Sequence, residues 1–99
     1  MKFTMLTALA ALTLTATGAL ALDKTECTLQ AGLVMQAVGA RSAGADNGAA
    51  KQQVEASLKG PSQKYAAIVP AVVDWVYTLP QDQLGAGVGD SWAQACLKQ

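Results

Sequence analysis

Two cysteines, Cys27 and Cys96, lie near the two ends of the segment that remains once an N-terminal leader is removed from this chain. Two cysteines allow only one intramolecular pairing, and an even number of cysteines in an exported chain is typical of a disulfide. Closing a loop of about 70 residues would stabilise the fold by roughly 4.4 kcal/mol in the chain-entropy model, which is an upper figure. The core of so small a domain supplies a comparable amount. We therefore predict a structural disulfide between Cys27 and Cys96.

Other uses of the two cysteines fit the sequence less well. A redox pair usually has C-x-x-C spacing beside a helix start. A metal site needs more nitrogen or sulfur ligands than this chain offers, since it contains no histidine. Intermolecular pairing and free thiols remain as alternatives.

The leader has the parts of a secretory signal peptide. Lys2 provides the positive start, residues 3–22 carry no charge, and an Ala-Leu-Ala cleavage site ends at Ala21. We predict a signal peptide over residues 1–21 and a single periplasmic or secreted domain over residues 22–99. The alternative is a membrane anchor, because twenty uncharged residues are long enough to span a bilayer. Five threonines among those twenty, and no basic stop after them, favour cleavage.

Charge and composition exclude several classes of function. The whole chain has seven basic and seven acidic residues, so it has no strong field for nucleic acid or, after cleavage, for a membrane surface. The absence of histidine removes the usual general base and the usual metal ligand. The serines have no histidine to activate them, and the carboxylates show neither the pairing used in glycoside hydrolysis nor a calcium-loop spacing. We predict no enzyme activity, no cofactor and no metal.

Hydrophobic periodicity predicts an all-α domain, a small bundle of four to five short helices closed by the disulfide between the first and last helix. The first helix is expected over residues 24–42, with Asp23 as its N-cap and Glu26 in capping-box position. The second is expected over residues 48–59, after a loop in which Asp46 or the following asparagine caps it. Gly60 stands at its predicted C-terminal cap.

The third segment, residues 62–79, is the most apolar, which predicts a helix at the centre of the bundle. Its β-branched residues make a strand the alternative. Pro70 either kinks one helix or starts a second. A single turn is expected over residues 81–84 and a last helix over residues 87–97.

Two features of the C-terminal half invite sharper interpretations. Asp74 is the one charge inside the most apolar segment, and a buried carboxylate there would be a candidate acid. A residue on a narrow solvent-facing strip is the simpler interpretation. The sequence GAGVGD over residues 85–90 resembles a phosphate-binding loop but has the wrong glycine spacing and follows no predicted strand. We interpret it as a flexible approach to the last helix.

The aromatic residues provide the best pointer to function. Trp75 and Tyr77 point about 160° apart on an ideal helix, so both are buried only if the helix is surrounded. An exposed aromatic would mark a partner surface. The candidate surface is the end of this helix, with residues Trp75, Tyr77, Leu79 and Pro80.

The C-terminal segment AAIVPAVVDWVYTLPQDQL…WAQAC resembles the end of small exported two-cysteine helical proteins of Gram-negative bacteria. The shared pattern is an apolar helix, a proline turn with a leucine four residues on (Pro80 and Leu84), and a last helix that ends in Cys96. Similar ends occur in the amidase-immunity proteins of the type VI secretion system. That resemblance covers about a third of the chain and implies binding and blocking of a cell-wall amidase. The chain lacks the extra cysteines of that family. The two-cysteine layout also resembles acid-stress periplasmic chaperones of the HdeA type.

Together these observations predict a small exported protein that acts by binding an unidentified protein partner, as an inhibitor or immunity protein. The alternatives are a periplasmic stress chaperone and a structural component of the envelope.

Overall fold

The structure is a computed structural model that describes residues 23–99, and the predicted signal peptide over residues 1–21 lies outside the described residues. The described part is helical without strands, which confirms the all-α prediction and excludes the strand alternative for the third segment. Its elements in order are α2 (Lys24–Ser42), α3 (Asn47–Ala56), the 3₁₀ helix η2 (Gly60–Ile68), α4 (Val69–Thr78), the 3₁₀ turn η3 (Gln81–Gln83) and α5 (Gly87–Leu97).

Two aspartates begin the first two helices. The Asp23 side chain accepts a hydrogen bond from the Glu26 backbone N–H at 2.9 Å, and the Asp46 side chain accepts one from the Ala49 N–H at 2.8 Å. Each carboxylate satisfies a backbone donor that has no partner inside its helix, and its charge suits the positive helix end. Both predicted N-caps are confirmed.

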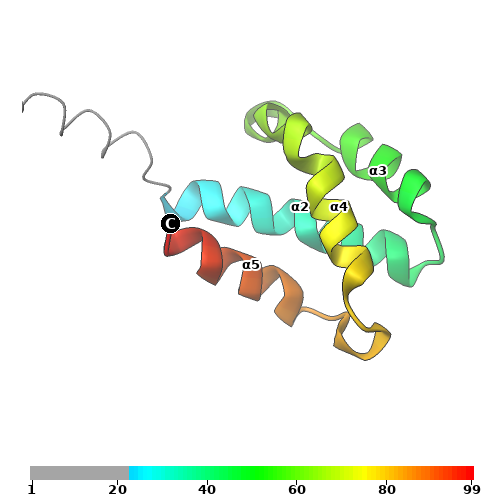
Figure 1. The fold of residues 1–99 in the computed structure, drawn as a ribbon. Coiled ribbons are helices and arrows are strands. Elements are labelled where there is room, and N and C mark those ends of the chain that lie inside the picture. Colours follow the sequence, from blue (N-terminus) through cyan, green and yellow to red (C-terminus); the bar gives the residue numbers. More distant parts are fainter. Residues whose placement is uncertain (1–22) are drawn as a thin grey trace, which may run out of the picture.

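Helix α2 is the element around which the others are arranged. It contacts α3, α4, α5 and η2. In Figure 1, α5 runs alongside α2 in the opposite direction, so that the C-terminus lies beside the start of α2. The disulfide joins these ends: Cys27 and Cys96 are bonded, with their Cα atoms 5.6 Å apart. The predicted connection between first and last helix is confirmed.

Valine is the commonest residue of the core, which also contains alanines, Leu33 and the two cysteines. No buried residue in the described part of the chain is polar or charged. The largest side chains with less than 2% exposure are Val34, Val54, Val69, Val72, Val73, Val76 and Cys27. Burying a valine completely stabilises by roughly 1.5–3 kcal/mol relative to leaving it exposed.

The third predicted helix is two elements. Residues 60–68 form the 3₁₀ helix η2, and α4 begins at Val69 with Pro70 in its first turn. Proline is well suited to that position, because its ring fixes a helical φ and its missing N–H would have no partner there. The interpretation that Pro70 starts a second helix is confirmed. The central position predicted for this segment is wrong. Helix α2 is the element that contacts α3, α4, α5 and η2, whereas Pro70 and Asp74 of α4 are exposed to solvent.

The second helix ends earlier than predicted. It stops at Ala56, with Ser57 as its C-cap, so Gly60 is not its capping glycine. Gly60 has φ +51° and opens η2 instead. Lys59 and Ser62 hold this turn, since the Ser62 hydroxyl accepts from the Lys59 N–H at 3.0 Å and donates to the Lys59 carbonyl at 2.9 Å.

None of the helices in residues 23–99 has the length and apolar character that a membrane span requires.

Candidate binding surface

A pair of tryptophans lies where α4 and α5 meet. The ring centroids of Trp75 and Trp92 are 5.4 Å apart, with 54° between the ring planes. Tilted aromatic pairs at this separation are favourable beyond the area they bury. Both side chains are half-buried, so each indole also offers surface to solvent. The Trp92 Nε1–H donates to the Gln30 side-chain oxygen at 3.0 Å, which orients the indole against α2.

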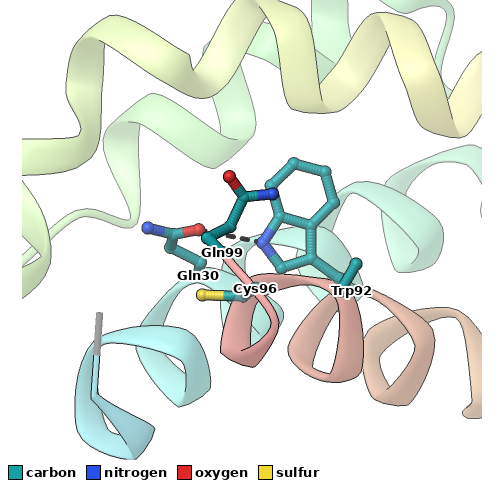
Figure 2. A pocket seen from close by; sticks show the side chains of 5 residues that line it. Gln30, Trp92, Cys96 and Gln99 are labelled. Atoms are coloured by element: carbon teal, nitrogen blue, oxygen red, sulfur yellow. Dashed lines mark hydrogen bonds between the residues drawn. The ribbon is translucent and has the colours of Figure 1, made fainter. Parts of the chain in front are cut away.

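A hollow of about 320 Å³ lies beside Trp92, close to the disulfide. Figure 2 shows the Gln30 and Gln99 amides converging on the indole, with the Cys96 sulfur below them. We call it the disulfide hollow, and its lining residues are Gln30, Trp92, Ala95, Cys96 and Gln99. None of these side chains carries a charge. The Gln30 and Gln99 amides can form further hydrogen bonds there, whereas the single Trp92 N–H is already bonded to Gln30.

A second hollow, of about 260 Å³, lies on the side of Trp75. We call it the turn hollow, since it follows the connection from α4 to α5, and its lining residues are Trp75, Leu79, Gln83, Gly87, Val88 and Ser91. It too has no charged side chain. The two hollows and the tryptophan pair form what we call the tryptophan surface.

The predicted partner surface is divided by the fold. Trp75 and Leu79 line the turn hollow. The Tyr77 side chain points elsewhere, and its hydroxyl donates to the Ala45 carbonyl in the loop between α2 and α3. Pro80 is exposed. Only two of the four predicted residues therefore lie on the tryptophan surface.

Tyr77 belongs to a cluster that holds the end of α4. The Arg41 guanidinium lies 5.4 Å from the Tyr77 ring centroid and donates to the Val76 and Leu79 carbonyls, each at 2.7 Å. These carbonyls belong to the last turn of α4 and the residue after it, where backbone acceptors have no helical partner. Arg41 and Tyr77 therefore have a structural role.

Gln30 and Trp92 are not among the residues that the sequence pattern singles out as a partner surface. Val88, Trp92, Ala95 and Cys96 recur at helical spacing, which predicts that they share the inward face of the last helix. Val88 and Cys96 are buried, whereas Ala95 is exposed and Trp92 is half-buried. No sequence signal links Gln30 to Trp92, because the two residues meet only when α5 lies on α2.

One glycine of α5, Gly89, has a packing role. Gly89 is buried, and a Cβ atom there would lie 2.7 Å from Cγ of Met35 and 3.4 Å from the Ala31 carbonyl oxygen. Helices α2 and α5 thus come close at Gly89, where α5 has no side chain in the way. The interpretation of residues 85–90 as a merely flexible approach was incomplete. Gly32 and Gly39, seven residues apart on α2, either allow a close approach or simply weaken the helix; the open space around both favours the second interpretation.

Charged groups meet at two places away from the tryptophan surface. Lys64 lies 2.8 Å from the Glu26 carboxylate, which also accepts from the Tyr65 hydroxyl. The hydrogen bond from Lys64, and then that from Tyr65, lower the pKa of Glu26, and the same Lys64–Glu26 bond raises the pKa of Lys64. Desolvation, followed by the bond to Glu26, raises the pKa of Tyr65.

Asp74 is the second charged site. It lies 2.9 Å from the Lys51 ammonium and accepts from the Asn47 amide at 3.0 Å. These two contacts lower the pKa of Asp74, with Lys51 the larger cause. Asp74 is exposed. The hypothesis of a buried acid is therefore wrong, and Asp74 links α4 to α3 at the surface.

Within residues 23–99 no group of three or more potential ligands is arranged to hold a metal ion. No protein-family model, curated protein or solved structure matches this chain.

Proposed function

We propose that this chain is a small exported protein that acts by binding another protein through the tryptophan surface, with no catalytic step of its own. One observation carries the proposal. Two tryptophans, the largest apolar side chains available, lie half-buried against each other between two uncharged hollows, while the valine core is complete beside them. Partly exposed tryptophans flanked by pockets are typical of the residues that dominate protein–protein binding energy.

The charge distribution supports a protein partner. The two ion-paired sites, at Glu26 and Asp74, are separate from the lining of both hollows. A surface without charged side chains loses little when it is desolvated against an uncharged protein surface.

We further propose that the partner is an enzyme that the chain inhibits, as in immunity proteins. The resemblance of the C-terminal segment to amidase-immunity proteins supports this finer proposal, and it predicts that the captured partner is a cell-wall amidase. A periplasmic chaperone would instead capture many different proteins and bind more apolar dye as the pH falls. An envelope component would capture a protein without enzymatic activity.

The test is affinity capture from periplasmic extract with the oxidised protein as bait. Trp75→Ala and Trp92→Ala probe the surface, and Gln52→Ala, an exposed change on α3, is the control. We expect the wild type and the control to retain one and the same protein, and each tryptophan variant to retain at least about 10-fold less of it. Melting curves must show that each variant is folded at the capture temperature. Equal retention by all four baits would refute the proposed surface.

A further inference from the structure

The completely buried valines form a three-helix core, and α5 packs along α2 in the most extensive contact between any two elements of the described chain. All the valines with less than 2% exposure belong to α2, α3 and α4. Apart from Cys96, α5 buries only Val88 and Gly89. The segment from α2 to α4 comprises about 55 residues, a length at which many domains still fold alone.

By itself α5 is a weak helix. It has 11 residues, which is marginal for an isolated helix in water. Gly87 and Gly89 both lie within it, and its N-cap, Ala86, provides no side-chain hydrogen bond. Glycine lowers helix propensity, and alanine is a poor N-cap. The position of α5 therefore depends strongly on its covalent bond to α2.

The tryptophan surface depends on α5 in turn. Helix α5 contributes Trp92, Ala95 and Cys96 to the disulfide hollow, and Gly87, Val88 and Ser91 to the turn hollow. The opposite walls come from Gln30 of α2, from Trp75 of α4 and from Leu79, the residue after α4. If α5 moves away, both hollows lose one wall and Trp75 loses its aromatic neighbour.

The disulfide is approachable from one side. Cys27 is 1% exposed and Cys96 6%, but Cys96 lines the disulfide hollow, below the Gln30 and Gln99 amides (Figure 2). A thiolate entering this hollow reaches Cys96 first.

We propose that the position of α5 is under redox control, and we call α5 the cover because it packs over the three-helix core. A dithiol reductant that enters the disulfide hollow opens the Cys27–Cys96 bond. Helix α5 then leaves the three-helix core, and the tryptophan surface is lost. The first reductant thiolate attacks Cys96, forms a mixed disulfide and expels the Cys27 thiolate. The second thiolate of the reductant attacks its own sulfur in that mixed disulfide and releases Cys96. The protein gains two electrons and two protons as two thiols, and the reductant becomes a disulfide.

The test compares amide hydrogen exchange in the oxidised full chain and in the same protein treated with dithiothreitol. We expect amides in residues 91–97 to lose at least about 100-fold more protection than those of α2 and α4, which remain protected by the three-helix core. The double variant Cys27→Ser/Cys96→Ser should show the reduced pattern with or without dithiothreitol, which controls for other effects of the reagent.

Two results would overturn the proposal. If residues 91–97 keep their protection after reduction, the disulfide does not hold the cover. If all helices lose protection together, or if the double variant does not fold, α5 is not a separable element.

The consequence for binding rests on the proposed function and is measured separately. A protein captured by the oxidised bait should be lost after reduction, and its undiminished capture by protein with α5 released would contradict control of the surface. If neither state captures a protein, the proposed function fails, whereas hydrogen exchange still decides whether α5 is released.

Discussion

Helix α2 makes two interfaces that differ in their chemistry, one with α3 and α4 and one with α5. Towards α3 and α4 it faces buried valines and alanines, and near its C-terminus Arg41 donates to two carbonyls at the end of α4. Towards α5 it contributes Gln30, Met35 and Cys27, which meet an indole, a glycine and a cysteine. The first interface is held largely by apolar burial spread over many side chains. The second is the most extensive contact between two elements of the described chain, and it includes a covalent bond, a close approach at Gly89 and a hydrogen bond to Gln30, each of which can be removed singly.

The largest expected effect comes from a charge placed in the valine core. Val73→Asp buries a carboxylate without a partner, which should cost more than about 4 kcal/mol and leave the chain unfolded. Far-UV circular dichroism measures the loss of helix. Ala71→Asp, at an exposed position on the same helix, is the control and should remain folded. A folded Val73→Asp protein would show that the valine core is less essential than its burial indicates.

Removal of the disulfide should come next in size. Cys27→Ser/Cys96→Ser is expected to lose about 2–4 kcal/mol, which corresponds to a fall in melting temperature of about 10 °C or more. Differential scanning calorimetry of the variant and of the oxidised wild type measures the difference. An unchanged melting temperature would mean that the covalent bond is not what stabilises the α5 side.

A smaller effect is expected at the close approach of α5 to α2. Gly89→Val places atoms against Met35 and should destabilise by about 1–3 kcal/mol. Gly87→Val is the matched control, because a side chain there has open space. Urea denaturation of both variants gives the comparison. Adding Met35→Ala should recover part of the loss, and equal stability of the two glycine variants would argue against a tight contact.

The smallest effect is that of pH. The lowered pKa values of Glu26 and Asp74 mean that their contribution is present above the usual carboxylate range and is lost as pH falls below about 4. The raised pKa values of Lys64 and Tyr65 mean that theirs is present at neutral pH and is lost as pH rises above about 10.

Melting temperature should therefore be nearly constant between about pH 6 and 8, since the chain has no histidine, and should decline modestly at both extremes. Glu26→Gln/Asp74→Asn should lose most of the acid dependence. A steep transition near neutrality would contradict this account.

Much of the fold was predictable because its signals are local. The bounds of the first and last helices, residues 24–42 and 87–97, agree with those of α2 and α5. Asp23 and Asp46 cap their helices through bonds to residues three positions on, a distance that sequence spacing reveals. The signal peptide and the exported location stay predictions.

The surface was less predictable because it depends on contacts between distant segments. Trp75 and Tyr77 were grouped by their proximity in sequence, but Arg41 and Ala45 fix Tyr77 on the other side of α4. The 3₁₀ geometry of η2 was also missed. Helices of 3.0 and 3.6 residues per turn give similar apolar patterns over nine residues, so periodicity does not separate them.

Local propensity, capping and counting are enough to establish that the chain is helical, where most helices begin, and that its only two cysteines can form one bond. Packing between helices establishes that α2 rather than α4 lies at the centre, that Gly89 is the point of close approach, and that Trp92 meets Trp75 and Gln30. Those outcomes depend on how helices pack against one another, and a pattern read along one helix carries no information about its neighbour.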